Sequence, residues 1–376
     1  MDARTVRRRL ARQDDEKSQM NERPESTLPF VSVVLPVRNE GPFIHRSLGA
    51  VLRQDYPRDR LEVIVADGMS TDGTRELLQD IQAQHDNLRI IDNPGRIVPT
   101  GLNAALAQAR GDVIVRVDGH TIIEPDYVRC SVEALRRSGA DGVGGRMDPV
   151  GDGAVAASVA LATTSPFGVG GARFHYSTRE EPADTMYLGA WPRALFERVG
   201  LFDEELVRDQ DDEFSYRVRA RGGSIFLSPS IRSRYYGRST YRTLWRQYFQ
   251  YGFWKVRVMQ KHPAQIRLRH LVPSAFAASL AALSLAAPFI ATARIALLAL
   301  TAAYVTGVVI ATLASARKGS PRPLACLPLT FAVLHLAYGF GVLSGLMRFR
   351  TRWRDRANRT SSQLSPRAAV VESRQG

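Results

Sequence analysis

The pattern of apolar and polar residues divides the chain near residue 260 into a part with short elements and a part with long apolar runs. In the first part, short β-branched runs alternate with helical patterns. The strand-like runs lie within 30–40 and at 61–66, 88–92 and 112–118, and the helical patterns cover 44–52, 74–84 and 102–108. This alternation predicts an α/β domain with a parallel sheet and right-handed crossovers.

Three apolar runs without charges follow, at 271–293, 295–316 and 323–347. About 20 apolar residues cross a bilayer, so we predict a membrane domain over 261–350. The alternative is a set of helices in a soluble core, which three consecutive runs with basic flanks disfavour. The first two runs predict a hairpin with a very short turn near Arg294. The third can be re-entrant, split or parallel to the membrane plane, and Gly339, Gly341 and Gly345 fit each alternative.

Charge is distributed unevenly along the chain, whose formal net charge is +14. Residues 255–376 hold 17 Lys and Arg but only 2 Asp and Glu, so the excess belongs to the apolar third. Basic flanks of apolar runs mark the cytoplasmic side of a membrane segment, whereas a nucleic-acid surface would make the globular part basic. We therefore expect a membrane-lipid partner, no nucleic acid, and a cytoplasmic location for the globular part.

The ends of the chain and its cysteines carry little functional signal. Residues 1–28 are charged throughout and lack the apolar core of a secretory signal, so they predict a disordered tail. Residues 351–376 predict a basic disordered tail. Cys130 and Cys326 form neither a disulfide framework nor a metal-ligand spacing, which indicates two ordinary thiols.

Acidic residues stand at the ends of predicted strands. Asp67 closes the run at 61–66, and Asp118 closes the run at 112–118. Ligands of parallel sheets bind beyond the carboxyl ends of the strands, so both carboxylates are expected in one crevice. Asp72, in TDGT, has an equally plain structural interpretation as the cap of the helix that follows. Asp211 and Asp212 add a further acidic pair beside a turn.

Four motifs occur in an order and at spacings that resemble glycosyltransferase family 2, over about residues 30–260. They are VSVVLPVRNE, VIVADGMSTDGT, GLNAALAQARGDVIVRVDGH and GLFDEELVRDQDDEFSYRVRARGG. Within this family the chain most resembles the ExoA type of succinoglycan biosynthesis. The resemblance implies a GT-A fold over 29–260, an inverting transfer from a nucleotide-sugar donor such as a UDP-hexose, and a lipid-linked saccharide acceptor.

The resemblance also implies the residues that bind the donor. Pro36, Arg38 and Glu40 would line the nucleotide pocket at the end of the first strand. Asp67 would accept hydrogen bonds from the uracil or the ribose, and Asp72 would follow in the same loop.

A divalent cation is implied at Asp118, the first residue of the family's metal motif. That motif usually reads Asp-x-Asp, whereas this chain has VDGH, so His120 takes the second position. Asp118 alone can hold Mg²⁺ together with water and phosphate oxygens, and His can also bind Mn²⁺. The choice between the two metals stays open, as does an interpretation of His120 as a bystander in the turn.

The general base is implied within the acidic run that follows GLFDEEL. Asp211 is the candidate, and Asp212 is the alternative, because Gln210 takes the position where the family has Glu. The resemblance also assigns substrate contacts to Asn103, Gln250 and Trp254. QYGFW at 250–254 resembles the Gln-x-x-Arg-Trp signature of processive members, but Phe stands where Arg belongs. Trp254 can equally be a membrane-interface residue.

Several other functions fit parts of this pattern. A processive polysaccharide synthase would share the fold, and a polyprenyl-phosphate sugar synthase would need no general base. A nucleotidyltransferase would carry a basic, Gly-rich phosphate loop after the first strand, which VRNEGPFIHRS does not provide. A membrane-anchored binding module would bind the sugar nucleotide without turning it over.

The segment 240–257, just before the apolar runs, is aromatic and basic. Its residues Arg242, Arg246 and Lys255 are expected to meet a lipid diphosphate or anionic headgroups.

Overall fold

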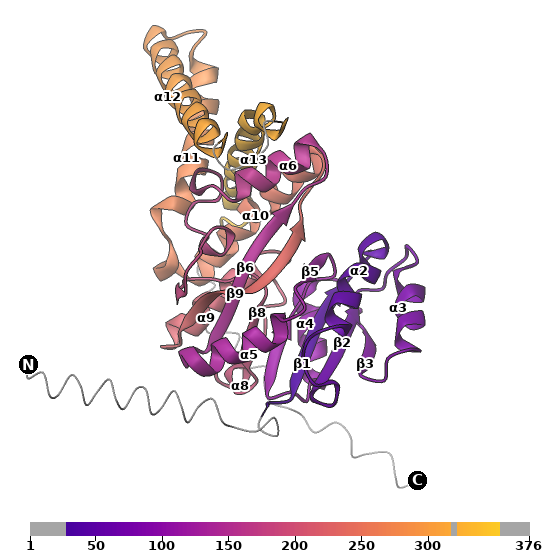
Figure 1. The fold of residues 1–376 in the computed structure, drawn as a ribbon. Helices are drawn as coiled ribbons and strands as arrows, with labels where there is room; N and C mark the ends of the chain where they lie inside the picture. Colours follow the sequence, from indigo (N-terminus) through magenta and orange to yellow (C-terminus); the bar gives the residue numbers. More distant parts are fainter. Residues whose placement is uncertain (1–27, 317–321, 354–376) are drawn as a thin grey trace, which may run out of the picture.

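The computed structural model describes residues 28–316 and 322–353 (Figure 1). Both predicted tails therefore lie largely outside the described residues. The strands are β1 (Val31–Val37), β2 (Leu61–Asp67), β3 (Leu88–Asp92), β4 (Val113–Arg116), β5 (Thr121–Ile123), β6 (Gly142–Val150), β7 (Glu181–Pro182), β8 (Gly189–Pro192) and β9 (Ile225–Tyr236). The helices are α2 (Gly41–Leu52), α3 (Thr74–Gln82), α4 (Val98–Gln108), α5 (Tyr127–Ser138), α6 (Ala154–Thr163), α7 (Pro166–Val169), α8 (Ala194–Val199), α9 (Gln210–Ala220), α10 (Tyr241–Lys261), α11 (Leu268–Ala286), α12 (Ala291–Ala316) and α13 (Leu327–Arg348). Short 3₁₀ turns add 58–60, 173–175, 263–265 and 322–325.

The strands form one sheet in the order β3-β2-β1-β4-β8-β6-β9-β5, with β7 beside β9. The predicted parallel sheet is present in β3, β2, β1 and β4. The remainder is mixed, because β8 runs antiparallel to both β4 and β6. In the parallel part Val37 pairs with Asp67, and Asp67 pairs with Asp92. The polar residues that follow these strands therefore emerge at one edge.

The parallel strands consist mostly of buried apolar residues, because helices cover both of their faces. Val33, Val63 and Val115 belong to one buried cluster, with residues of α2 and α5. Val34 and Ile64 belong to the opposite cluster, with residues of α4, α8 and α9. This two-sided burial fixes the register, since a shift by one residue would exchange the two faces.

The apolar third forms three helices, and two of them, α12 and α13, are long and apolar enough to cross a membrane. In Figure 1 α12 projects away from the sheet, and many of its apolar side chains are exposed. The turn expected near Arg294 lies at 287–290 instead, because α11 ends at Ala286 and Arg294 belongs to α12. The third apolar run is not split, since α13 is continuous over 22 residues.

Helix α10 packs along α13 at three glycines. A Cβ on Gly252 would lie 2.1 Å from the carbonyl oxygen of Tyr338, and one on Gly341 would lie 2.2 Å from that of Phe249. Gly345 approaches Phe253 in the same way, at 2.6 Å. The glycines thus allow the two helix backbones to approach each other closely. They do not interrupt α13, which is continuous. The predicted boundary at residue 260 therefore falls at the end of a helix that is itself packed against the apolar part.

We predict that Gly252→Ala lowers the stability of the protein by about 1–3 kcal/mol, because the methyl group must push α10 away from α13. Thermal unfolding in detergent measures the loss. Gly237→Ala is the matched control, since its Cβ would meet only Val159 Cγ1, at 3.6 Å. Equal midpoints for the two variants would contradict the close packing of α10 on α13.

Candidate active site

A cavity of about 1090 Å³ opens at the carboxyl ends of β1 and β4. Near the sheet it is lined by residues that follow these strands and by the start of α9. It continues past α10 to side chains of α11, α12 and α13, including Phe276, Tyr304 and Leu334. One cavity therefore joins the polar edge of the sheet to the helices that can cross a membrane.

Asp118 lies at the polar end of the cavity and is paired with Arg116 through two hydrogen bonds, of 2.9 and 3.2 Å. Burial opposes the charge of Asp118, but Arg116 and His120 outweigh it and hold the pKa of this carboxyl below its usual range. Asp118 is thus ionised at neutral pH. Arg116 is a strand residue two positions earlier, so its side chain lies on the same side of the strand.

His120 is held in an orientation that suits a metal ligand. Its Nδ1 lies 3.0 Å from Glu40 Oε1, and its ring meets Tyr235 edge-on, with the centroids 5.6 Å apart. A carboxylate on Nδ1 fixes the tautomer that leaves Nε2 free to bind a cation. Within 28–316 and 322–353 no group of three or more His, Cys, Asp or Glu side chains is arranged to enclose a metal. Asp118 and His120 therefore offer at most two protein ligands, so a cation held by them would complete its shell with water and phosphate oxygens.

The start of α9 brings three aspartates to the cavity, around the buried ammonium of Lys255. Lys255 Nζ is hydrogen-bonded to Asp212 and lies 3.8 Å from Asp209. Thr185 Oγ1 also donates to Asp212, at 2.7 Å. Burial opposes the charge of Asp212, but Lys255 and Thr185 outweigh it and hold the pKa of Asp212 below its usual range. Asp212 is consequently a paired carboxylate.

In the described part of the chain, Lys255 forms ion pairs with Asp209 and Asp212 but not with Asp211. Among the described residues the side chain of Asp211 accepts one hydrogen bond, from the backbone N–H of Asp212 at 3.0 Å. Burial and the neighbouring Asp212 raise the pKa of Asp211, while Arg116 opposes the shift. Asp209 has a left-handed backbone, with φ of 60°, and burial raises its pKa to about 7. Glu213, which follows Asp212 in the sequence, is bound to Arg217 and His262 and does not line the cavity.

Of the residues predicted to bind the donor, Pro36, Arg38 and Glu40 line the cavity. Asp67 and Asp72 do not, and both organise the loop after β2. Asp67 is fully buried and accepts from Ser70 Oγ at 2.6 Å and from Arg75 at 3.1 Å.

Asp72 accepts from Thr74, through both its backbone N–H and its hydroxyl, and from the backbone N–H of Gly41. It therefore ties the first residue of α3 to the start of α2, whereas the N-cap position of α3 is taken by Gly73.

Of the other predicted substrate residues, Gln250 lies at the cavity, whereas Asn103 and Trp254 do not. Gln250 lines the cavity and accepts from Arg208 Nε at 3.2 Å. The side-chain amide of Asn103 instead joins α4 to the backbone of Phe202, since it donates to the carbonyl oxygen at 2.9 Å and accepts from the N–H at 3.0 Å. Trp254 packs against Phe253 and Phe349 and is not part of the cavity wall.

Lys255 corrects one expectation from the sequence. We expected it to meet lipid phosphates or headgroups, whereas it is buried among the aspartates of α9. Its partners are more than 40 residues away in the sequence, so no local pattern indicates this contact. Arg116 was also missed, although the two-residue period of a strand places it beside Asp118.

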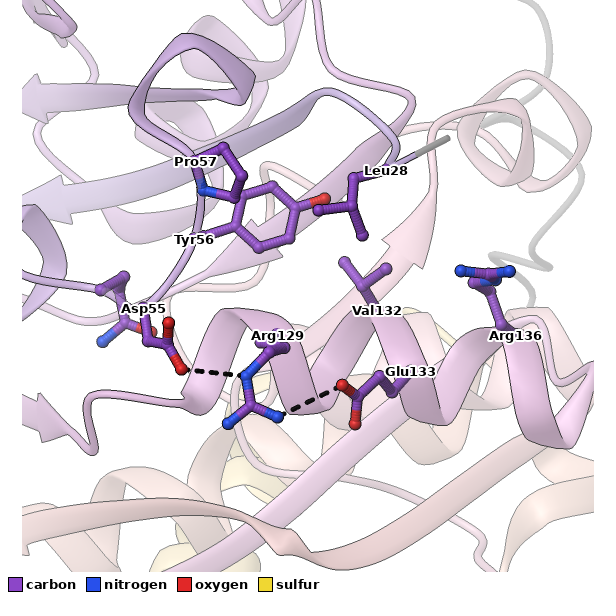
Figure 2. Close-up of a pocket in the computed structure, with 9 residues that line it drawn as sticks. Leu28, Asp55, Tyr56, Pro57, Arg129, Val132, Glu133 and Arg136 are labelled. Carbon is purple, nitrogen blue, oxygen red and sulfur yellow. Dashed lines mark hydrogen bonds and ion pairs between the residues drawn. The ribbon is translucent and has the colours of Figure 1, made fainter. Parts of the chain in front are cut away.

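A second cavity, of about 460 Å³, lies between α5 and the segment 54–57 (Figure 2). Asp55 and Glu133 are both paired with Arg129 there, at 3.0 and 3.2 Å. It also includes Leu28, which precedes β1, so it lies toward the amino end of that strand. It holds no free carboxylate pair and is remote from Asp118, so we assign the chemistry to the larger cavity.

Comparison with known proteins identifies the family of this chain. The family model described as glycosyl transferase family 2 matches residues 32–198. The succinoglycan biosynthesis protein ExoA of Rhizobium meliloti (strain 1021) is 32% identical over 247 residues, which cover 65% of this chain and 74% of ExoA. The chain belongs to glycosyltransferase family 2. The resemblance to this family and to its ExoA type is thereby confirmed, and the protein is a glycosyltransferase.

Two further relatives cover nearly the whole of this glycosyltransferase. A dolichyl N-acetyl-α-D-glucosaminyl phosphate 3-β-D-2,3-diacetamido-2,3-dideoxy-β-D-glucuronosyltransferase of Methanococcus voltae is 25% identical over 327 residues, 85% of this chain and 98% of its own. A mannosyltransferase of Pyrobaculum calidifontis, solved in complex with GDP-Man and Mn²⁺, superposes with a TM-score of 0.55 at 20% identity. That superposition covers 88% of this chain and 92% of the mannosyltransferase. The predicted GT-A fold, followed by apolar helices, is confirmed.

For this glycosyltransferase we predict that Lys255→Met costs about 3–5 kcal/mol of stability at pH 8, because it leaves a buried carboxylate at Asp212 without its cation. The pairing holds the pKa of Asp212 down, so the wild-type contact is intact at both pH 8 and pH 5. In the variant the pKa of Asp212 rises, and protonation at pH 5 relieves part of the cost. Thermal unfolding at both pH values checks this, with the exposed Arg242→Met as control. A loss that is the same at both pH values would contradict it.

Proposed function

We propose that this glycosyltransferase moves a hexose, with inversion, from a nucleotide-sugar donor to a hydroxyl group of a lipid-linked saccharide. The observation that carries the proposal is the single cavity that runs from Asp118 and Asp211 to side chains of α11, α12 and α13. A soluble acceptor would not require this connection to apolar helices. The names of the relatives support the proposal, since one acts on a dolichyl-linked sugar phosphate and another takes part in succinoglycan biosynthesis.

The donor end is proposed at the edge of β1. Pro36, Arg38 and Glu40 line the cavity there, and Arg38 is exposed, with one hydrogen bond to the backbone oxygen of Arg96 at 3.3 Å. Asp67 and Asp72 are proposed to act indirectly, because they do not line the cavity but fix the conformation of the loop that follows β2. We retain a UDP-hexose as the proposed donor.

A divalent cation is proposed at Asp118 and His120. When bound, it neutralises the charge that develops on the leaving nucleoside diphosphate. Asp118 would contribute an ionised carboxylate, and the contact of Glu40 with Nδ1 of His120 would leave Nε2 as the nitrogen able to bind the cation. The Mn²⁺ in the Pyrobaculum mannosyltransferase supports a cation in a related fold, and Mg²⁺ and Mn²⁺ both suit this donor set.

Asp211 is proposed as the general base. It takes the proton of the acceptor hydroxyl as that oxygen attacks the anomeric carbon from the face opposite the nucleotide. Its carboxyl has no cationic hydrogen-bond partner among the described residues, and its raised pKa makes it a stronger base than an ordinary aspartate. Asp212 is less suited, because Lys255 and Thr185 occupy its oxygens.

The proposed setting is the cytoplasmic face of a bacterial-type inner membrane. Helices α12 and α13 can cross the bilayer, and the basic residues beside the apolar runs favour the cytoplasmic side for the sheet. Gln250 is proposed to contact the acceptor, since it belongs to α10, lines the cavity and accepts a hydrogen bond from Arg208. Trp254 and Asn103 are proposed to support the acceptor site from outside the cavity.

We predict that Asp118→Ala abolishes transfer in assays with radiolabelled UDP-sugars and membrane lipid extracts, because the diphosphate loses its neutralising partner. Excess EDTA should have the same effect on the wild type. His120→Asn should reduce transfer and change the relative activity with Mg²⁺ and Mn²⁺. Full wild-type activity in excess EDTA would refute the proposed cation.

We predict that Asp211→Asn lowers the rate of transfer by about 10²- to 10⁴-fold and hardly changes the affinity for the donor. Asn keeps the shape of the side chain but cannot take a proton. Equilibrium binding of the radiolabelled donor and single-turnover transfer separate the two effects. Asp212→Asn is the comparison, and a larger loss of rate in that variant would move the base to Asp212. Full activity of Asp211→Asn would favour a polyprenyl-phosphate sugar synthase, whose phosphate acceptor needs no base.

A further inference from the structure

We propose that Arg238 and Arg246 form a binding site for the phosphate or diphosphate of a polyprenyl-type lipid carrier, which enters the cavity from the membrane helices. The inference rests on the proposed function and adds the part of the acceptor that these residues hold. Arg238 lies between β9 and α10, and Arg246 lies in the second turn of α10. Both line the cavity.

Neither arginine is neutralised by the protein. Within 28–316 and 322–353, Arg246 makes no hydrogen bond or ion pair, and Arg238 makes one hydrogen bond, from Nε to Gln247 Oε1 at 3.3 Å. Arg116 and Lys255 in the wall differ, since they are paired with Asp118 and Asp212. Arg38, Arg96 and Arg208 also line the cavity without an ion pair in the described part of the chain, but they lie on loops after β1 and β3 and before α9, at the sheet end of the cavity. Two exposed guanidinium groups beside a cavity and without carboxylates are suited to an anionic ligand.

A polar framework orients the site. Gln247 uses both ends of its amide, because Oε1 accepts from Arg238 while Nε2 donates to the hydroxyls of Tyr235 at 3.1 Å and Tyr251 at 2.8 Å. All three of these side chains line the cavity. The hydrogen bond at Nε leaves the terminal nitrogens of Arg238 available for phosphate oxygens.

The order of side chains along the cavity matches that of a lipid-linked sugar. On the membrane side Phe167, Phe276 and Tyr304 form an aromatic cluster, with Leu334 beside it in the cavity wall. This is an apolar environment suited to a hydrocarbon chain. The aspartates of α9 lie at the other end.

Helix α10 places the arginine site between these two ends. Leu244 packs with Phe331 and Val308 of the apolar helices, and Lys255 contacts the aspartates. Arg246 is nine positions before Lys255, a separation of about 13 Å at 1.5 Å per residue. A carrier phosphate at Arg246 would thus leave room for a short saccharide that reaches Asp211.

Binding of a defined lipid phosphate to the full-length protein in neutral detergent tests the proposal. Radiolabelled farnesyl diphosphate is the probe, and EDTA is present so that the proposed cation site does not hold the diphosphate. We expect Arg238→Gln and Arg246→Gln each to raise the Kd by about 10- to 100-fold, the loss typical of a charged hydrogen bond. Farnesol should bind weakly and equally to all proteins, and inorganic pyrophosphate should compete poorly because it lacks the apolar chain.

Arg242→Gln is the matched control, since Arg242 is exposed on the same helix but does not line the cavity. Unchanged affinity in the Arg238 and Arg246 variants would overturn the proposal. An equal loss in Arg242→Gln would indicate general attraction to the surface of the protein, and tight binding of pyrophosphate alone would indicate a site for free phosphate. Either result overturns it as well. The assay contains no donor, so a failure of transfer to lipid-linked saccharides refutes the proposed function separately.

Discussion

The ion pairing of buried Lys255 with Asp209 and Asp212 is the interaction on which the rest of the active site depends. Burial opposes the charge of Lys255, but Asp209 and Asp212 stabilise it and hold the pKa of Lys255 well above the usual range. Without a cation at this position, three neighbouring aspartates would have to share one buried space as like charges. Lys255 binds Asp212 and leaves Asp211 without a cationic hydrogen-bond partner. One contact therefore separates a structural carboxylate from a candidate catalytic one.

The same contact joins the two parts of the molecule, because Lys255 belongs to α10 and the aspartates belong to the start of α9. A second group of contacts strengthens this joint. Arg257 and Lys261 of α10 and Arg352, which follows α13, all bind Glu205, in the loop before α9. Burial opposes ionisation of Glu205, but these cations outweigh it and lower its pKa to about 2. The loop that leads into the aspartates is thus held by α10 and by the segment that follows α13.

This arrangement explains why a single cavity serves both a polar and an apolar substrate region. Helix α10 lies against α13 at three glycines, and Lys255, three residues after Gly252 and on the same side of the helix, reaches the aspartates. A change in the position of α13 would therefore be transmitted to α9 through a rigid helix. The geometry favours an acceptor that is itself half apolar, in accord with the names of two relatives of this family 2 glycosyltransferase.

The sequence alone determined much of this protein. Periodicity and length indicated the strands at 61–66 and 88–92 and the three apolar helices, because burial on two faces and the crossing of a bilayer would both demand continuous apolar residues. Strand ends indicated Asp118, and the ordered motifs indicated the family.

Only the tertiary structure decided the partners of these residues. Asp67, Asp72 and Asn103 were expected at the substrate, but they face loop and helix contacts, since a carboxylate or amide at a strand end or on a helix can serve a backbone as well as a ligand. Lys255 looked like a headgroup contact, and it became buried because the packing of α10 on α13 brings it against α9. Such long-range pairings depend on how the helices pack, so the pattern of apolar and polar residues along the chain does not predict them.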